Sequence, residues 1–246
     1  MPFTYFAHQV FVLPFKVARP RWFDGTALCI GSMAPDFAYA FEALPFEFGS
    51  HTASSQFTWT LPFTLLATLC VRRLATPLGE QLPSPLGLEV QALSRSRHSP
   101  LVSAWSALLG GFSHVFVDGF THGHGWAVAE FPSLRAEVFD AIPVSKVLQY
   151  TGHTLGTLIG FAMFARLVAA RRVSQWNGDA DSAEAREPER WFWPFVAAGS
   201  LLSIPAASSV LVTGGGAPAA IMRASWVLLA VLVVATLRAR RPPATC

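Results

Sequence analysis

Charged residues are scarce in this sequence. Asp, Glu, Lys and Arg make up 13% of the 246 residues, and hydrophobic residues make up 52%. Charged residues reach roughly 25% in ordinary soluble domains, so these few cannot cover a soluble globule of this size. The net charge is only +3, and the arginines fall in short clusters rather than along the continuous basic face that nucleic acid requires. The composition therefore favours a membrane protein whose partner is membrane lipid and not nucleic acid.

Cysteine is also rare. The three cysteines, Cys29, Cys70 and Cys246, are widely spaced and form no CxxC motif. This pattern favours neither a disulfide framework nor a thiolate metal site. The N-terminus lacks the basic stretch and the Ala-x-Ala cleavage site of a signal peptide, so we expect it to remain in the mature chain.

Long apolar runs, in contrast, are abundant. A helix needs about 20 apolar residues to cross the hydrocarbon core. Five segments approach this length, at residues 57–71, 101–121, 150–170, 191–212 and 218–237. Two weaker segments precede them: residues 3–17 are short, and residues 26–44 are interrupted by Pro35 and Asp36. We predict an all-α fold, a polytopic integral membrane helical bundle of about six or seven spans.

Polar stretches divide the chain. Residues 173–190 are charged and have the composition of a flexible linker. We therefore predict a motif-bearing membrane helical domain at residues 1–172, a polar cytoplasmic linker at 173–190, and a C-terminal pair of transmembrane helices at 191–246.

Clusters of basic residues predict the orientation in the membrane. The positive-inside rule places residues 16–21, 72–100 and 171–190 in the cytoplasm, together with the C-terminus. The segments that then lie outside are 45–56, 122–149 and 213–217. We expect a multi-pass protein of the cell's inner (plasma) membrane with a cytoplasmic C-terminus, and an N-terminus outside if residues 3–17 cross.

Polar residues interrupt one apolar segment at regular spacing. The stretch GGFSHVFVDGFTHGHGW carries His114, Asp118 and His122 at four-residue intervals, which places the first two on one helix face. An ionisable side chain inside a membrane helix costs on the order of 3 kcal/mol or more and usually faces a cavity or a partner. Histidine nitrogen and aspartate oxygen are also ligands of zinc, manganese and iron.

The predicted topology brings further polar residues to a similar depth. The residues that can converge near the extracytoplasmic face are His8, Asp36, His51, His114 and Asp118. Some of the polar residues of these segments also have a purely structural interpretation. His8 and His153 can be hydrogen-bonded residues inside apolar helices, and Asp36 can cap a helix N-terminus after Pro35. His124, between two glycines, fits a loop.

Several motifs resemble a known family. The chain contains "MPFT", "IGSMAPDFAY", "SHT", "SHVFVDGFTHGHGW" and "IPVSKVLQYTGHTLG" in this order. They resemble the uncharacterised bacterial domain-of-unknown-function family 4184, from Met1 to about Ala170. The last two predicted spans carry no motif of this kind.

A more distant resemblance is to membrane-bound metal-dependent hydrolases, which carry an early His, a Pro-Asp pair, a His-x-x-x-Thr-His segment and a Ser-His-x-x-x-Asp segment. It implies metal ligands at His8, Asp36, His51, His114 and Asp118. Two positions depart from that pattern. Phe37 and Ala38 follow Asp36 where a second acid is expected, and one histidine rather than two precedes Thr52. The resemblance therefore implies one divalent metal, with zinc as the expected ion.

Three functions fit these features. The first is a metal-dependent hydrolase of the bacterial inner membrane, in which Asp36 or Asp118 acts as general base and His122 orients the substrate or supports the ligands. A site at the outer face favours an amphiphilic substrate, such as a lipid or lipid-linked ester. The second is a non-catalytic protein whose buried His/Asp network is structural. The third is a small-solute transporter. The sequence does not indicate the oligomeric state.

Overall fold

The structure is a computed structural model that describes residues 4–42, 49–138, 141–178 and 187–240. Its regular structure is almost entirely helical, as predicted. The exception is a short antiparallel hairpin, in which β1 (Glu137–Val138) pairs with β2 (Ile142–Pro143). Five helices within the described residues are long and apolar enough to cross a membrane.

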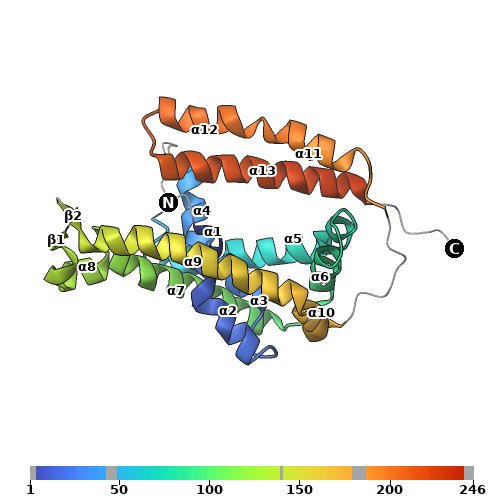
Figure 1. Ribbon diagram of the computed structural model, residues 1–246, viewed down its shortest axis with the longest axis horizontal. Helices are drawn as coiled ribbons and strands as arrows, with labels where there is room; N and C mark the ends of the chain where they lie inside the picture. The colour runs from blue at the N-terminus through green and yellow to red at the C-terminus, as the bar shows by residue number, and fades with distance from the viewer. Residues whose placement is uncertain (1–3, 43–48, 139–140, 179–186, 241–246) are drawn as a thin grey trace.

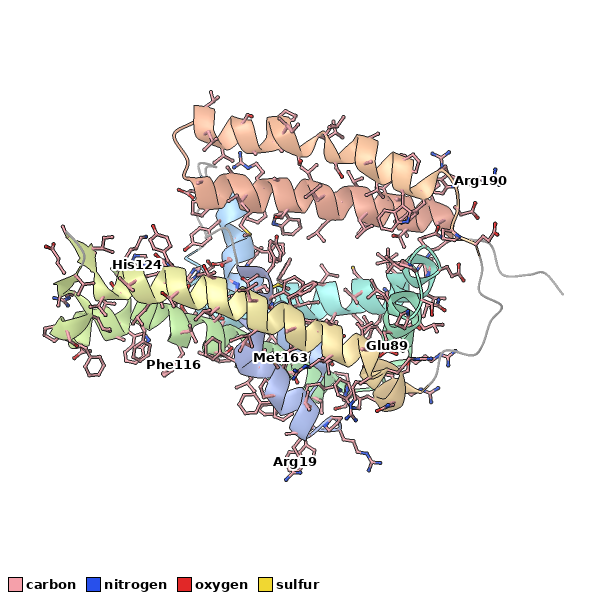
Figure 2. All side chains as sticks on the ribbon, viewed as in Figure 1. Arg19, Glu89, Phe116, His124, Met163 and Arg190 are labelled. Atoms are coloured by element: carbon pink, nitrogen blue, oxygen red, sulfur yellow. The ribbon has the colours of Figure 1, made fainter. Side chains whose placement is uncertain are left out.

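These five helices coincide with the five strong apolar segments. Their elements are α5 (Leu61–Gly79) with the π-helical turn η2 (Gln56–Thr60) before it, α7 (Pro100–Thr121), α9 (Val144–Ala169), α11 (Phe192–Ser200) joined to α12 (Ser203–Val212), and α13 (Ala217–Ala239). Large apolar side chains such as Phe116, Leu158 and Val212 are exposed on them, and Phe116 projects away from α7 in Figure 2. Apolar outer surfaces of this kind are compatible with contact with lipid.

The two weaker segments form broken helices. In place of the predicted segment 3–17, of which residue 3 lies outside the described residues, the structure has α1 (Thr4–Ala7) and α2 (Gln9–Ala18), and the left-handed backbone of Phe6, at φ 69°, breaks α1 internally. Residues 26–42 contain α3 (Gly25–Gly31), α4 (Ala34–Phe37) and η1 (Ala38–Phe41); residues 43 and 44 of the predicted segment lie outside the described residues. Each helix is shorter than a single span needs. The predicted number of six or seven spans is therefore not confirmed.

The broken helices lie among the long ones. Figure 1 shows α11, α12 and α13 in one layer, with α5, α7 and α9 in another. Helix α3 packs closely on α7 because each helix has a glycine at the contact, Gly31 in α3 and Gly110 in α7. A Cβ on Gly31 would come within 2.4 Å of the Ala107 carbonyl oxygen, and one on Gly110 within 2.5 Å of the Leu28 carbonyl oxygen. Small residues allow such close approach of backbones in membrane bundles.

Basic helix ends gather at one end of the molecule. Arg240 donates to the carbonyl of Arg73, and Arg171 pairs with buried Glu89 of α6 (Leu86–Ala92). The Glu89 carboxylate also accepts from the backbone nitrogen of Val173 at the start of α10 (Arg172–Asn177). The first residues of the predicted linker are thus helical, and residues 179–186 lie outside the described residues.

The remaining short elements complete the described chain. The 3-10 turn η3 (Leu93–Arg95) follows α6. After α7 come α8 (Trp126–Glu130) and the 3-10 turn η4 (Pro132–Leu134), which lie beside the β-hairpin at the other end of the molecule in Figure 1. The candidate site lies where α4, the segment after residue 49 and α7 meet.

Candidate metal centre

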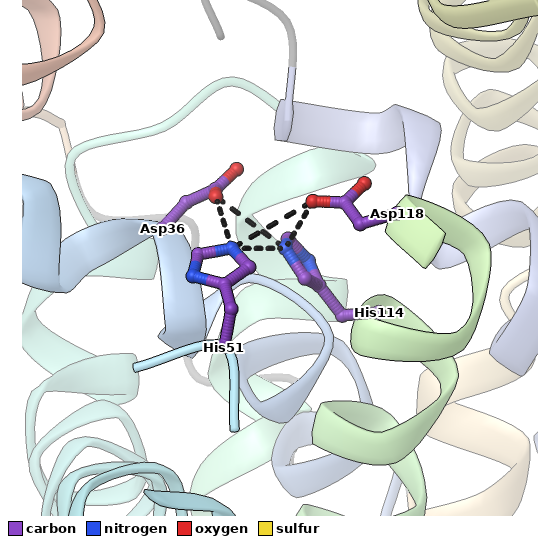
Figure 3. Close-up of side chains that lie close together, drawn as sticks. All are labelled: Asp36, His51, His114 and Asp118. Carbon is purple, nitrogen blue, oxygen red and sulfur yellow. Dashed lines mark hydrogen bonds and ion pairs between the residues drawn. The ribbon is translucent and has the colours of Figure 1, made fainter. Parts of the chain in front are cut away.

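Four polar side chains from three separate parts of the chain meet in one cluster. Asp36 comes from α4, His51 from the segment that begins at residue 49, and His114 and Asp118 from successive turns of α7. One ligand atom of each residue lies within 4.8 Å of those of the other three. Figure 3 shows the four side chains pointing toward a common centre. They are four of the five predicted metal ligands.

The separations within the cluster are compatible with metal ligands. His114 Nε2 lies 3.2 Å from Asp118 Oδ2 and 3.4 Å from Asp36 Oδ1. His51 Nε2 lies 3.2 Å from Asp36 Oδ1 and 3.6 Å from Asp118 Oδ2, and the two Nε2 atoms are 3.3 Å apart. Two ligands held about 2.1 Å from a tetrahedral ion are about 3.4 Å apart. Direct hydrogen bonds have lengths of about 2.7 to 3.2 Å, so the two shortest separations, at 3.2 Å, are also compatible with hydrogen bonds.

Hydrogen bonding fixes which nitrogen of His114 faces the cluster. The ring is fully buried, and its Nδ1 lies 2.8 Å from the carbonyl oxygen of Ser32. Because a carbonyl only accepts, Nδ1 carries the hydrogen and a neutral ring directs the lone pair of Nε2 at the carboxylates of Asp36 and Asp118. A lone pair facing two carboxylates requires a cation between them, either a proton or a metal ion. Backbone carbonyls orient metal-ligating histidines in this way.

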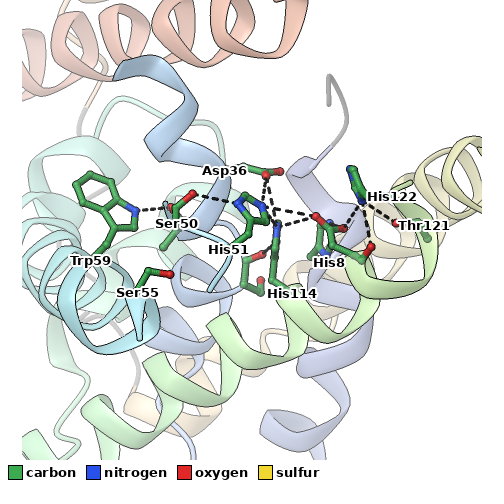
Figure 4. Close-up of polar contacts among 12 residues, drawn as sticks. His8, Asp36, Ser50, His51, Ser55, Trp59, His114, Thr121 and His122 are labelled. Atoms are coloured by element: carbon green, nitrogen blue, oxygen red, sulfur yellow. Dashed lines mark hydrogen bonds and ion pairs between the residues drawn. The ribbon is translucent and has the colours of Figure 1, made fainter. Parts of the chain in front are cut away.

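A network of side-chain contacts positions His51. Its Nδ1 lies 3.0 Å from the Ser50 hydroxyl, which directs Nε2 to the cluster. The buried amide of Gln56 donates to the carbonyls of Ser50 and Thr52, both at 3.0 Å. Gln56 begins the π-helical turn η2, and such turns are frequent at functional sites. Figure 4 shows Ser50 next to His51, beside the cluster.

Two predicted residues lie next to the four. The ring of His8 stacks on that of His114 with 4.0 Å between centroids, and its Nε2 is 3.7 Å from Asp118 Oδ1. His122, just after α7, has Nδ1 3.6 Å from the same oxygen. His8 therefore lies beside the cluster rather than within it. His8 is next to Oδ1 of Asp118, whereas His51 is next to Oδ2.

The chain matches one family over nearly its whole length. The family is described as "Domain of unknown function (DUF4184)", and the match covers residues 1–239. The chain belongs to the DUF4184 family. The match continues beyond Ala170, through the last two helical spans, in which no motif was identified from the sequence. No curated protein and no solved structure matches the chain, so the resemblance to metal-dependent hydrolases has no support from these comparisons.

A cleft reaches the cluster of this DUF4184 protein. It has a volume of about 260 Å³, and its lining includes Tyr39, His51, Asp118, His122 and Trp126. Burial raises the pKa of the Tyr39 phenol above its ordinary value, and the carboxylates of Asp36 and Asp118 raise it further. The hydroxyl therefore stays protonated and is a hydrogen-bond donor. His124 also lines the cleft and is exposed.

Sequence reasoning missed two residues of the site. Tyr39 has its ring centroid 5.2 Å from that of His51. Gln149 of α9 has its amide nitrogen 2.9 Å from His122 Nε2. Tyr39 lies within the quoted IGSMAPDFAY motif, which was the available signal for it. Gln149 likewise lies within the quoted IPVSKVLQYTGHTLG motif, at a polar position of an apolar helix.

Proposed function

We propose that this protein is a membrane-embedded metal-dependent hydrolase that acts on a lipid or lipid-linked ester. One divalent ion, zinc by the tetrahedral spacing and the N/O donors, is held by Asp36, His51, His114 and Asp118. The observation that carries the proposal is the position of the buried His114 Nε2, which faces the carboxylates of Asp36 and Asp118 while Nδ1 is held by the Ser32 carbonyl. The two carboxylates carry a formal charge of about −2, which a divalent cation balances.

The cluster has the groups that ester hydrolysis requires. A divalent ion at such a site lowers the pKa of bound water and polarises a carbonyl or phosphoryl oxygen. A carboxylate oxygen of Asp36 or Asp118 that does not bind the ion accepts the proton of the attacking water. Tyr39 and His122 line the cleft and orient the substrate by hydrogen bonds.

An apolar groove next to the cleft supports the proposal of an amphiphilic substrate. The groove has a volume of about 510 Å³ along α7, and Val115 and Trp126 line both it and the polar cleft. Its other lining residues are Phe11, Phe112, Ser113, Phe116 and Val117. An acyl or prenyl chain can lie in this groove while the ester group enters the cleft. Orientation with the cleft at the extracytoplasmic face remains a prediction from the basic clusters.

Metal content tests the proposal. We expect purified wild-type protein to retain zinc after desalting, and His114→Ala and Asp118→Ala to lose most of it by mass spectrometry. The control is His98→Ala, because His98 contacts Lys16 away from the cluster. Equal, negligible metal in wild type and variants would exclude the metal centre.

Hydrolysis separates a catalytic from a structural metal. We expect metal-loaded wild-type protein in mixed micelles to hydrolyse p-nitrophenyl acyl or phosphodiester probes, and Tyr39→Phe to fold normally but to turn over more slowly. Metal binding without hydrolysis of either probe, combined with a lower melting temperature in His114→Ala, would favour the non-catalytic alternative. In that case the ion would clamp α4 to α7.

A further inference from the structure

A largely apolar cavity lies near the basic end of the molecule and shares no lining residue with the metal cluster. Its volume is about 220 Å³, and helices α2, α3, α9 and α10 supply most of its walls. Its apolar lining includes Leu13, Ile30, Phe164, Val168 and Val173. An apolar cavity of about 150 Å³ holds a molecule the size of benzene. This cavity therefore has room for several methylene groups of a longer chain.

Lys16 brings a buried positive charge to the wall of this cavity. The residue is only 4% exposed. Its Nζ lies 2.8 and 3.0 Å from the carbonyl oxygens of Pro20 and Phe23 and 3.1 Å from His98 Nε2, and it stands over the ring of Trp176. None of these groups is a carboxylate. Among the described residues the ammonium thus has hydrogen-bond acceptors but no ion-pair partner.

The one acidic residue close to Lys16 in the sequence is already engaged. Asp24 Oδ2 accepts from Arg72 and from the hydroxyl of Ser103, and Oδ1 accepts from the backbone nitrogens of Thr26 and Ala27. The Asp24 carboxylate therefore balances Arg72 and leaves the charge of Lys16 without a matching anion.

Basic residues dominate the segments around the cavity. The segments that line it or contact Lys16 are residues 13–30, 93–98 and 164–177, and Asp24 is their only acidic residue. Their basic residues number eight: Lys16, Arg19, Arg21, Arg95, Arg97, Arg166, Arg171 and Arg172. An apolar cavity among so many positive charges matches a ligand that is both apolar and anionic.

Some of these arginines are exposed close to the contacts of Lys16. Arg19 and Arg21 flank Pro20, and Arg97 precedes His98. Figure 2 shows Arg19 at the end of α2. Arg172 lies four residues before Trp176 on α10, which places both on one helix face. All four arginines are exposed, so they are available to an anion outside the cavity.

We propose that this cavity binds an anionic phospholipid, with one acyl chain inside it and the phosphate among the exposed arginines. Basic pockets between membrane helices bind anionic head groups, and the planar guanidinium of arginine suits phosphate oxygens. The site does not depend on the proposed hydrolase function. A lipid bound here would contact α2, α3, α9 and α10 together, and it would therefore stabilise the folded protein.

The contacts of Lys16 favour a phospholipid over a free fatty acid. An ammonium group has three hydrogens to donate, and three acceptors already surround Nζ. No donor of Lys16 is then left for a carboxylate inside the cavity. The anionic group is instead held outside, by arginines from the end of α2, the segment before α7 and the start of α10. A phosphate with several oxygens can reach more than one of them.

Thermal unfolding of the full-length protein tests this inference. Protein is purified and delipidated in a neutral detergent, and phosphatidylglycerol or phosphatidylcholine with the same acyl chains is added. We expect saturating phosphatidylglycerol to raise the melting temperature by about 5 °C and phosphatidylcholine to raise it much less. Native mass spectrometry should show one phosphatidylglycerol retained per chain.

Two kinds of variant separate the cavity from the arginines. Val168→Phe fills the cavity, and the combined Arg19→Gln/Arg21→Gln/Arg172→Gln variant removes charge at its edge. We expect each to lose most of the shift caused by phosphatidylglycerol. Lys146→Gln is the control, since it removes an exposed cation at the start of α9, beside the β-hairpin at the other end of the molecule. Melting temperatures without lipid verify folding, and Val173→Phe replaces Val168→Phe if the latter does not fold.

Several outcomes would contradict the proposal. Equal shifts with the two phospholipids would remove the role of charge, and a full phosphatidylglycerol shift in Val168→Phe and Val173→Phe would place the lipid elsewhere. An equal shift with glycerol phosphate would show that no chain enters the cavity, and a larger shift with oleate would assign the cavity to a free fatty acid. Zinc content, measured on the same samples, reports on the metal centre independently.

Discussion

At the scale of single residues, the four-residue spacing of His114 and Asp118 was the most informative signal. On a helix it places both side chains on one face, and the structure confirms that they meet at 3.2 Å. The position of His8 was harder to predict. The backbone turns sharply at Phe6, with φ 69°. His8 follows this turn and lies next to Oδ1 of Asp118. A local break of this kind leaves no periodic trace in the sequence.

Replacement of Asp36 by Asn tests its role as a ligand. Asp36→Asn keeps the shape of a side chain that is 2% exposed and removes its charge. We expect zinc affinity to fall by more than the roughly 10- to 100-fold lost when a residue that only supports a ligand is changed. Competition with a chromogenic chelator measures the change.

The control for this variant is Glu130→Gln, which removes an exposed carboxylate at the end of α8. Unchanged zinc affinity in Asp36→Asn would remove Asp36 from the ligand set.

At the scale of elements, hydropathy located the five long helices but not the breaks between short ones. Residues 26–44 read as one apolar segment interrupted at Pro35 and Asp36, whereas the structure has three short helices here, α3, α4 and η1, between Gly25 and Phe41. The division matters because it turns Asp36 toward α7 and leaves the Ser32 carbonyl available to His114. Apolar composition predicts which segments are apolar and how long they are. It does not predict where the backbone of such a segment bends.

The close contact of α3 with α7 predicts a strong effect of one methyl group. A Cβ at Gly110 would lie 2.5 Å from the Leu28 carbonyl oxygen and 2.7 Å from the Ser32 nitrogen. Because both neighbours are backbone atoms, we expect Gly110→Ala to separate the helices and to destabilise the protein by about 1 to 3 kcal/mol. It should also weaken zinc binding through Ser32 and His114.

Thermal unfolding and zinc competition measure the two effects of Gly110→Ala. Gly123→Ala is the matched control, since a Cβ there meets nothing within 4 Å. Equal melting temperatures for the two variants would contradict the tight α3–α7 contact.

At the scale of the whole molecule, the C-terminal helices support the site from a distance. Arg223 of α13 donates to the carbonyls of Ala40 and Glu42, at 3.0 and 2.8 Å. Trp226 donates to the carbonyl of Phe37, directly after Asp36. The family match through residue 239 agrees with this dependence. The division into a domain at 1–172, a linker at 173–190 and a helix pair at 191–246 stays a prediction, and contacts between such distant segments leave no local pattern in the sequence.

Removal of these contacts should lower metal affinity without changing a ligand. In Arg223→Ala two backbone carbonyls lose their donor, and we expect the segment that carries Asp36 to loosen and zinc affinity to fall by about 10-fold. The control is Arg238→Ala, which removes a cation–π contact with Trp191 near the other end of α13. Both variants can lower the melting temperature. An equal loss of zinc affinity in both would show that the effect is general destabilisation.

The donors of the cluster are dispersed along the chain, from Asp36 to Asp118. No peptide fragment or partly synthesised chain that ends before α7 contains the complete set. If the cluster binds an ion as proposed, capture of that ion would follow synthesis of α7. Occupancy of the proposed centre would then report that the segments from α4 to α7 have come together.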